Sequence, residues 1–529
     1  DSYAGKYEGM DRYECRKAMI KDLEDEGLLV KVEDHSHNVG QCYRCGTTVE
    51  PIVSKQWFVK MKPLAQPAID AVKNGDTQFV PEHFEKVYFH WLENIRDWCI
   101  SRQLWWGHRI PAWYCDECGE VVVSKETPTV CPKCGCNHLT QDPDTLDTWF
   151  SSALWPFSTL GWPEKTEDLD YFYPNDVLVT GYDIIFFWVA RMIMAGYEYE
   201  GKMPFKNVYF TGIVRDKLGR KMSKSLGNSP DPLDLIDKYG ADGVRVGMLL
   251  CAPAGGDLLF DESLPEQGRN FTTKMWNAFK LVKSWEVASI DQPAHSRLAL
   301  EWFNHLLGKV NETLNTQFDQ YRISEALMTV YTTFRDEFSS WLLEMIKPAY
   351  GQPIDRKTYE ETLNVFEQLL QLLHPFMPFI TEEIWQTLRE RQDGESIMIS
   401  RLPKATSYDE SYLLRFEAVK NIIVGIRNIR KQNNIAFKDV LELKVKKNER
   451  YPASFDSIIR KMGNIGQIGL VNEPVKGAWS FIVDTVEYFI PAQGEVNTAE
   501  VKAKLEEELN YTRGFLTSVM KKLSNEKFV

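Results

Sequence analysis

The sequence predicts an α/β domain with a parallel βαβ unit, followed by an all-α bundle, a small α+β segment and a long terminal helix. Two apolar runs with strand character, residues 176–181 and 207–214, flank a helix-like stretch at residues 182–192. After Leu264 strand signals become rare, and helical periodicity continues to about Pro403. With 529 residues the chain is long enough for several domains.

The first fifty residues show no pattern for a core of their own. Residues 10–26 have the pattern of a polar helix, and residues 27–32 have the pattern of a short strand. We therefore expect this part to be the tail of a domain and a connector.

The rest of the chain divides by the type of element that the pattern predicts. Helices are expected over residues 324–345, 359–373 and 412–432, and short strands over 440–445 and 480–483. The expected regions are 1–50 (tail and connector), 51–262 (α/β domain), 263–405 (helical bundle), 406–497 (small α+β domain) and 498–529 (terminal helix).

The terminal helix, from Thr498 onward, carries apolar residues at steps of four and three. They are Leu505, Leu509, Leu516, Val519 and Leu523, and Thr512 occupies the remaining position of this repeat, which we call the seam. This heptad spacing is typical of a coiled coil, although Gly514 interrupts it. Arg513, Lys521, Lys522 and Lys527 give its second half positive charge.

Composition excludes several classes of protein. A formal net charge of -13 argues against a generally basic RNA-coating protein, although a local basic face remains compatible with it. No apolar run is long enough for a membrane span, and we expect no secretory leader. Most of the ten cysteines lie in or beside Cys-x-x-Cys pairs, which favours metal binding in a reducing compartment. We expect a cytoplasmic protein, and we expect it to be a monomer.

Two Cys-x-x-Cys pairs predict a structural zinc site. The four candidate ligands are Cys115, Cys118, Cys131 and Cys134. Gly119 and Gly135 follow the second cysteine of each pair, as a tight turn requires, and four thiolates complete a tetrahedral Zn²⁺ site with no open position. Cys136 and His138 are alternative ligands. The other interpretation is a loop of reduced cysteines without metal.

A further pair, Cys42 and Cys45, has no second pair to complete it. We expect either a vacant half-site or a metal site completed by His35 or His37.

A lysine-rich loop is the most informative feature of the chain. The run Lys221-Met222-Ser223-Lys224-Ser225 lies between Gly219 and Gly227, just after the second predicted strand. Two lysines on a glycine-flanked loop suit a reaction in which negative charge builds up on a phosphate. The alternative is an ordinary solvated surface loop.

The first predicted strand ends at Gly181, where ligands bind in parallel sheets of this kind. A missing side chain there permits the close approach of a ribose. Asp183 is placed either to accept hydrogen bonds from ribose hydroxyls or only to cap the helix that follows.

Five runs follow one another along the chain: DTLDTWFSSALWP (144–156), GYDIIFFW (181–188), GRKMSKSLGN (219–228), DP (231–232) and YGAD (239–242). Taken together, these runs resemble the valyl-tRNA synthetases, a family of class I aminoacyl-tRNA synthetases, over nearly the whole chain. Isoleucyl-type synthetases are the second candidate. A zinc-bearing tRNA-binding protein without catalysis is the third. A generic ATPase is disfavoured because the chain has no P-loop sequence.

The resemblance implies a Rossmann-like catalytic domain that adenylates valine with ATP and Mg²⁺ and transfers it to tRNA-Val. It implies that Lys221 and Lys224 face the ATP phosphates, with Ser223 and Ser225 as further donors, and that Gly181 and Asp183 hold the ribose. It also implies that Trp149, Ile184 and Trp188 line the valine pocket. From the residues alone, Ile184 and Trp188 share one face of a helix and are equally compatible with ordinary core positions.

Class I synthetases also need a His-x-Gly-His element, and the chain has none, since Gly107-His108 has the wrong partners. By resemblance, residues 1–50 match only the end of an editing insertion. We therefore expect the chain to be a C-terminal part of such an enzyme, without one half of the adenylation site and most of the editing domain, and to be inactive alone.

The helical region resembles the anticodon-binding bundle of the family, and the terminal helix resembles the start of its coiled-coil arm. Arg427, Arg430 and Lys431 are candidates for contacts with RNA phosphates. A solvated charged helix face is an equally good interpretation of these three residues.

Overall fold

The computed structural model describes residues 2–42, 45–50, 53–223, 226–492 and 498–523. The chain forms two compact units. The first consists of residues 1–59 and 98–146, and the second of residues 60–97 and 147–529.

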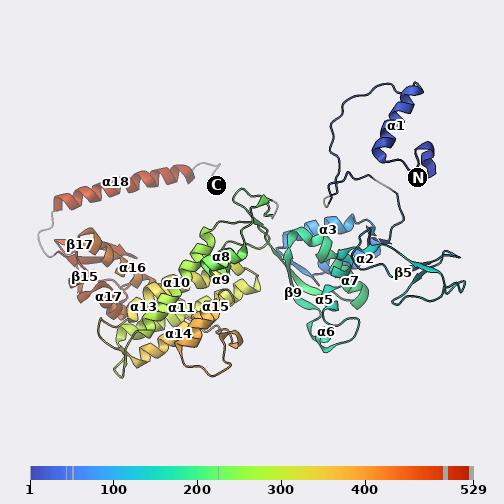
Figure 1. Ribbon diagram of the computed structural model, residues 1–529. Helices are drawn as coiled ribbons and strands as arrows, with labels where there is room; N and C mark the ends of the chain where they lie inside the picture. Colours follow the sequence, from blue (N-terminus) through green and yellow to red (C-terminus); the bar gives the residue numbers. More distant parts are fainter. Residues whose placement is uncertain (1, 43–44, 51–52, 224–225, 493–497, 524–529) are drawn as a thin grey trace. The chain divides into compact units, whose positions relative to one another are not determined.

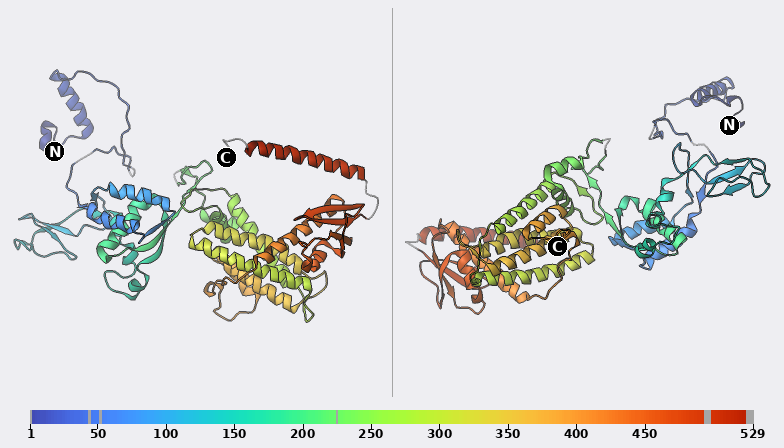
Figure 2. Two further views of the ribbon diagram at one scale, coloured as in Figure 1. Left: turned by 180° about the vertical axis from the view of Figure 1, so that it is seen from behind. Right: turned by 60° about the horizontal axis from the view of Figure 1, so that its bottom comes forward.

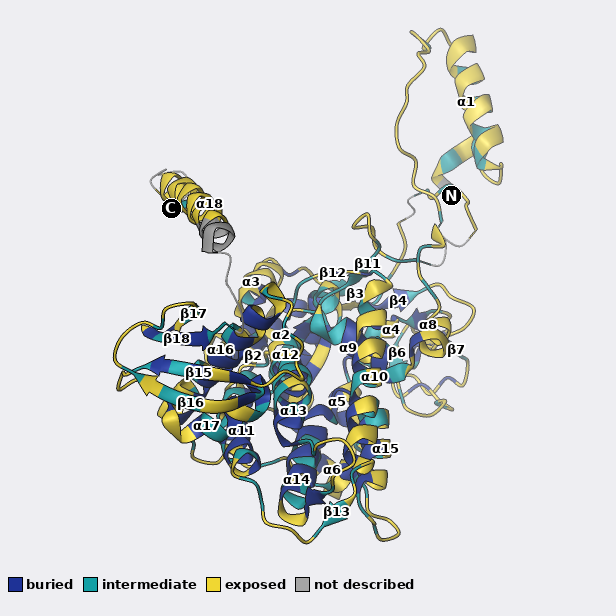
Figure 3. Cartoon of the chain, turned by 90° about the vertical axis from the view of Figure 1, so that its left-hand side faces the viewer, coloured by how far each residue is buried: buried dark blue, intermediate teal, exposed yellow. Residues whose placement is uncertain are grey.

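The N-terminal part of the first unit is open to solvent. A 3-10 turn, η1 (Ser2–Tyr7), precedes helix α1 (Arg12–Asp25), whose N-terminus is capped by Asp11 and which buries no side chain. Figure 3 shows α1 coloured mostly as exposed. The predicted strand at residues 27–32 is wrong: Val30 is 96% exposed, and none of these residues belongs to a sheet of the described chain.

The rest of the first unit is built from small antiparallel sheets. Asp142 connects them, because its buried carboxylate accepts hydrogen bonds from Trp57 Nε1 (2.8 Å) and the Tyr114 hydroxyl (2.6 Å). The pairs are β1 (Phe58–Val59) with β3 (Trp98–Cys99) and β4 (Ser101–Arg102) with β8 (Thr145–Leu146). The three-stranded sheet has the order β6 (Val121–Val123), β5 (Ala112–Cys115), β7 (Leu139–Gln141).

The second unit begins with a parallel three-stranded sheet, and this confirms the predicted βαβ unit. Its order is β2 (Gln78–Val80), β10 (Phe205–Thr211), β9 (Asn175–Gly181). The inward-facing Phe79 and Phe210 pack edge to face at 5.3 Å, and Phe79 also packs on Tyr88. Among the described strands β9 pairs only with β10, and Val177 and Val179 of β9 are exposed.

Short elements surround this sheet (Figure 1). Helix α2 packs on α7, which connects β9 with β10. The elements are α2 (Met61–Lys73), η2 (Glu82–Phe84), α3 (Glu85–Glu93), α4 (Thr148–Ser152), α5 (Trp155–Ser158), α6 (Glu167–Phe172), α7 (Ala190–Glu200), β11 (Val214–Arg215) and β12 (Leu258–Leu259).

The segment after β9 is not the regular α-helix predicted over residues 182–192. It starts as a 3-10 turn, η3 (Tyr182–Ile184), continues as a π-helical turn, η4 (Ile185–Val189), and becomes α-helical only at Ala190. The wider π turn changes the spacing of side chains, so the four-residue rule for Ile184 and Trp188 does not apply.

The predicted helical region is confirmed as a bundle whose long helices lie side by side (Figure 2). Its core contains Phe303, Phe334, Phe338 and Phe366, all fully buried. The elements are α8 (Pro232–Tyr239), α9 (Ala241–Leu250), α10 (Ser263–Lys283), β13 (Val287–Ala288), α11 (Ala294–Asp319), α12 (Ile323–Thr332), the π-helical η6 (Thr333–Leu342), α13 (Leu343–Ile346), β14 (Ile354–Asp355), α14 (Arg356–Leu373), α15 (Pro378–Leu388) and η7 (Ile397–Ile399).

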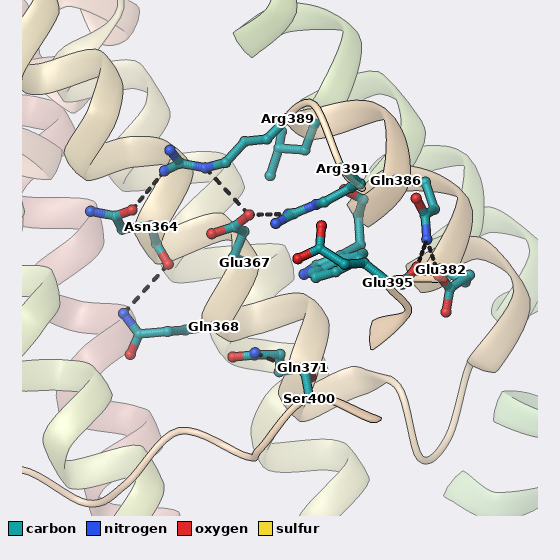
Figure 4. Close-up of polar contacts among 12 residues, drawn as sticks. Asn364, Glu367, Gln368, Gln371, Glu382, Gln386, Arg389, Arg391, Glu395 and Ser400 are labelled. Carbon is teal, nitrogen blue, oxygen red and sulfur yellow. Dashed lines mark hydrogen bonds and ion pairs between the residues drawn. The ribbon is translucent and has the colours of Figure 1, made fainter. Parts of the chain in front are cut away.

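Polar side chains join the end of α15 to α14 (Figure 4). Glu367 on α14 pairs with both Arg389 and Arg391, and Arg389 also donates to the side-chain oxygen of Asn364 at 2.6 Å. The Arg391 guanidinium lies 3.5 Å from the centre of the Trp385 ring. Glu367 thus holds two partly buried cations, of which Arg389 has Glu360 as a second counter-charge at 3.0 Å.

Asp242, in the YGAD run, holds the N-terminus of another helix. Its buried carboxylate accepts hydrogen bonds from the backbone N–H groups of Phe379 (3.3 Å) and Ile380 (2.6 Å) in α15. Arg245, one turn later, donates to the carbonyls of Pro375 and Phe376. This carboxylate therefore attaches α9 to the first turn of α15.

We expect Asp242→Ala to lower the free energy of unfolding by about 1–3 kcal/mol, because two partly buried N–H donors lose their acceptor. Urea denaturation followed by circular dichroism measures the change. Asp237→Ala, which removes an exposed carboxylate from α8, is the matched control. Equal midpoints for the two variants would contradict the capping role.

The C-terminal region also confirms its predicted helix and strands. Helix α16 (Glu410–Gln432) packs on α11, and a four-stranded sheet has the order β16 (Ile465–Val471), β15 (Leu441–Lys446), β18 (Val486–Pro491), β17 (Ala478–Val483). The turn η8 (Ala453–Phe455) leads into α17 (Asp456–Gly463). Helix α18 (Thr498–Leu523) exposes Leu509, Leu516 and Leu523 of the predicted seam. No helix in the described part of the chain is long and apolar enough to cross a membrane.

Candidate functional site

The candidate site lies where the parallel sheet ends. A Cβ atom at Gly181 would come within 2.8 Å of Asp183 Oδ1, so the backbone here passes close to that carboxylate. Asp183 makes no capping hydrogen bond, and the interpretation of Asp183 as a helix cap is therefore wrong. Its Oδ2 atom instead lies 3.2 Å from Lys221 Nζ.

Lys221 is thus brought to the sheet edge beside Gly181. The backbone of Lys221 forms an antiparallel bridge with Arg215 of β11. Both members of the Lys221–Asp183 pair are solvent-exposed, with side-chain exposures of 65% and 41%. Such pairs contribute little to stability, so a ligand can separate them at small cost. Lys224 and Ser225 lie outside the described residues.

The base of the lysine loop is held by two residues that the sequence did not single out for this role. Asn228 donates from its amide to Asp216 Oδ2 (2.9 Å), and its Oδ1 accepts the N–H of Ser223 (2.9 Å). Asp216 also accepts the backbone N–H groups of Leu218 and Arg220. The Asn228 amide, with these donors, holds the pKa of Asp216 well below its usual range.

Asp257 connects three segments near the end of the parallel sheet. Its Oδ1 accepts from the Tyr182 hydroxyl (2.8 Å) and the Ile213 N–H (3.2 Å), and its Oδ2 pairs with Arg215. A Cβ atom at Gly212 would collide with the backbone carbonyl of Gly256, so these two segments touch through their main chains. Asp257 therefore links the end of β10 to the strand that carries the lysine loop.

The predicted pocket residues lie on neighbouring elements. Trp188 donates from Nε1 to the carbonyl of Ser152 (3.3 Å), at the end of α4, and its ring packs 5.5 Å from Trp155. Trp149 stacks on Phe187 at 6.1 Å. Ile184 is half-buried at the end of the 3-10 turn. The two tryptophans thus come from elements that pack together.

The four predicted zinc ligands converge. The Sγ atoms of Cys115, Cys118, Cys131 and Cys134 all lie within 4.8 Å of one another. Cys115 and Cys134 are 3.5 Å apart, and Cys118 and Cys131 are 3.7 Å apart. Tetrahedral Zn²⁺ with Zn–S bonds of about 2.3 Å requires sulfur separations of about 3.8 Å, so the residues fit the ion.

The backbone geometry of the two knuckles supports the same four cysteines as zinc ligands. Gly119 and Gly135 have positive φ, and their N–H groups donate to the carbonyls of Cys115 and Cys131, which closes each knuckle. Hydrogen bonds, first from the backbone N–H of Cys118, lower the pKa of Cys115 to about 6, while burial and hydrogen bonds with neighbouring thiols raise the pKa of Cys118 and of Cys134. Cys136 is not in the group: its Sγ accepts the N–H of His138 at 3.2 Å.

Beside the pair Cys42 and Cys45, the Gly46 N–H donates to the Cys42 carbonyl at 2.8 Å. Within the described ranges no third metal-binding side chain joins this pair, and His35 and His37 stack on each other instead.

Of the candidate phosphate-binding residues on α16, Arg430 is buried. Its guanidinium donates to the carbonyls of Ala436, Asp439, Gly463 and Asn464, so it fixes the chain after α16. The prediction that Arg430 contacts phosphate is therefore wrong. Arg427 and Lys431 are exposed.

Comparison with known proteins identifies the family. The model of the class I tRNA synthetases (I, L, M and V) matches residues 13–261, and that of the anticodon-binding domain of tRNA ligase matches residues 301–445. The chain belongs to the class I tRNA synthetases. It is 56% identical to the valine–tRNA ligases of Phocaeicola vulgatus and Parabacteroides distasonis over 99% of its length, and 45% identical to that of Symbiobacterium thermophilum.

The chain spans about 61% of the length of these relatives. The solved structure of Mycobacterium tuberculosis methionyl-tRNA synthetase with methionyl-adenylate has a similar fold, with a TM-score of 0.50 and 19% identity over 70% of each chain. Membership of the family confirms the resemblance drawn from the lysine loop and the motifs around it.

Proposed function

We propose that this chain carries the lysine-loop part of a valine–tRNA ligase, which adenylates valine with ATP and transfers it to tRNA-Val. One observation carries the assignment to this site: the Lys221 ammonium lies 3.2 Å from the Asp183 carboxylate, two residues from the end of a parallel strand at Gly181. The valine specificity rests on the relatives, which are valine–tRNA ligases at over 50% identity.

In this proposal Lys221 and Lys224 stabilise the charge that develops on the phosphates of ATP. The valine carboxylate attacks the α-phosphorus, and negative charge grows on its nonbridging oxygens and on the leaving pyrophosphate. A lysine acts there as a fixed positive charge, and Ser223 and Ser225 add hydroxyl donors. Mg²⁺ enters with ATP as part of the substrate.

The ribose is assigned to Gly181 and Asp183. Asp183 is exposed and uncommitted to any helix cap, which leaves its oxygens able to accept hydrogen bonds from ribose hydroxyls. Lys221 then exchanges one anion, the carboxylate of Asp183, for another, the phosphate of the nucleotide. Because the Lys221–Asp183 pair is exposed to solvent, separating it costs little free energy.

The valine side chain is assigned to a pocket formed by Trp149, Ile184 and Trp188. The π turn at residues 185–189 supports this assignment, because such turns are frequent at functional sites. Structural Zn²⁺ is assigned to the four converging cysteines, where it would tie β5 to the loop that follows β6. The anticodon-binding family match and the bundle support tRNA as partner of residues 263–405.

The assignment is tested by titrating the chain with a nonhydrolysable valyl-adenylate analogue in a calorimeter. We expect the valyl analogue to bind at least about tenfold more tightly than the isoleucyl analogue, since one methylene group changes binding by roughly 10–200-fold. Trp188→Ala should weaken binding of the valyl analogue.

The control is Trp479→Ala, which removes a half-buried tryptophan of β17. This variant should bind the valyl analogue as tightly as the parent chain does. Equal affinity for the two analogues, or binding unaffected by Trp188→Ala, would contradict the pocket.

A further inference from the structure

A cavity of about 420 Å³ lies in the second unit where α11, α13, α16 and α17 meet. Apolar residues line part of it, including Ile346, Phe437 and Met462. The family motifs and the proposed adenylation site do not involve it. Its polar wall contains an uncommon pair of side chains, Lys461 and His295.

Lys461 reaches this wall from α17 and is held by two acceptors. Its Nζ donates to the backbone carbonyl of Lys347 (2.7 Å) and lies 3.0 Å from His295 Nε2. A neutral amine has two N–H groups and one lone pair, so these two acceptors use both donors and leave the lone pair in the remaining direction. A nitrogen held in this way is prepared for nucleophilic attack.

The surroundings of Lys461 increase the fraction of neutral amine near pH 7 above that of an ordinary lysine, although the ammonium form still predominates there. Burial first, and then the positive charge of Lys347, lower its pKa to about 8, while Glu344 opposes the shift. Burial and the neighbouring Lys461 lower the pKa of His295 to about 4, so the imidazole is neutral near pH 7, and its Nε2 atom lies within hydrogen-bond distance of the amine. Asp355 is committed to capping α14 through the Thr358 N–H.

The cavity also offers a cation for an anionic ligand. Lys347 is paired with Glu344 at 2.6 Å. Arg427 borders the same cavity, lies over the Trp341 ring at 5.5 Å, and has no carboxylate within 4.0 Å in the described part of the chain. A phosphate group fits the forked guanidinium of an arginine.

We propose that Lys461 is a site of covalent acylation by small acyl phosphates, with Arg427 binding the phosphate and His295 accepting the proton. The Lys461 nitrogen attacks the carbonyl carbon and forms the C–N bond of an amide. The C–O bond to phosphorus-bound oxygen breaks, and inorganic phosphate leaves with the electron pair. The proton from nitrogen passes to His295 Nε2 and then to water or the departing phosphate.

The test exposes the 529-residue chain to acetyl phosphate and measures acetylation of each lysine by mass spectrometry over time. Exposed Lys404 serves as the internal reference. At pH 7.5 we expect Lys461 to react at least about tenfold faster, because an ordinary lysine with a pKa of about 10.4 is almost entirely protonated there.

An uncharged reagent, acetic anhydride, separates the reactivity of the Lys461 amine from phosphate binding by Arg427. With it, the rate at Lys461 should rise with pH to half its maximum near pH 8, and Arg427→Gln should leave the rate unchanged. With acetyl phosphate the same variant should slow Lys461 but not Lys404. His295→Gln should slow Lys461 with both reagents, and thermal melting curves establish that both variants are folded.

Similar rates at Lys461 and Lys404 with both reagents would overturn the proposal. A preference for Lys461 that persists in Arg427→Gln with acetyl phosphate would overturn the phosphate-binding role of Arg427.

Discussion

Replacing Cys115 with serine is expected to abolish stoichiometric zinc binding and to unfold the sheet of β5, β6 and β7. Four thiolates of this geometry form a closed site, and structural Zn²⁺ contributes about 10–16 kcal/mol of apparent binding free energy in small zinc domains. Atomic absorption measures the bound zinc. Limited proteolysis between residues 116 and 138 reports the unfolding of the knuckle.

Cys136→Ser is the matched control, because Cys136 is also buried in this knuckle but lies outside the group of four. It should retain the zinc and the resistance to protease. Loss of zinc from Cys136→Ser together with its retention in Cys134→Ser would show that the ligand set is different. Zinc-free protein that resists protease like the parent chain would contradict a structural role.

Lys221→Ala is expected to lower the rate of valine-dependent ATP–pyrophosphate exchange by about 10²–10³-fold in a chimaera in which this sequence replaces the matching part of the Phocaeicola vulgatus valine–tRNA ligase. This is the typical effect of removing one preorganised group that stabilises developing charge. The KM for valine should change little, because the lysine acts on the phosphates. The loss should therefore appear in kcat.

Lys217→Ala is the control in the same loop region, since Lys217 is exposed and paired with Asp261. Its exchange rate should equal that of the parent enzyme. Lys221→Arg keeps the charge and should recover part of the activity lost in Lys221→Ala. An exchange rate in Lys221→Ala equal to that of the control would refute the proposed role of the loop.

The features that could be predicted from sequence are those fixed by local spacing. Cys115 and Cys118 belong to one turn, and the turn glycine Gly119 is visible in the chain. The strand that ends at Gly181 was also predictable, because its apolar run is continuous and short. The family resemblance followed from the lysine loop, whereas the contact between Lys221 and Asp183 became visible only in the fold.

What could not be predicted depends on contacts between distant residues. Asp216 and Asn228 are twelve positions apart, and only the folded loop brings the carboxylate to the amide. Arginine side chains are usually exposed, so the sequence suggests an exposed Arg430. In the fold its guanidinium is buried, and hydrogen bonds to four carbonyls compensate for the lost contact with water. The π turn after Ile184 was missed because periodicity analysis assumes 3.6 residues per turn.

The side of β9 that pairs with no other described strand has a practical consequence for handling this chain. A strand whose outer backbone groups lack a neighbour is a template for pairing with another polypeptide, and the exposed Val177 and Val179 make that encounter favourable. Concentrated preparations should consequently gain β-rich aggregates with time, and a lysine introduced at Val179 should delay their appearance in light scattering.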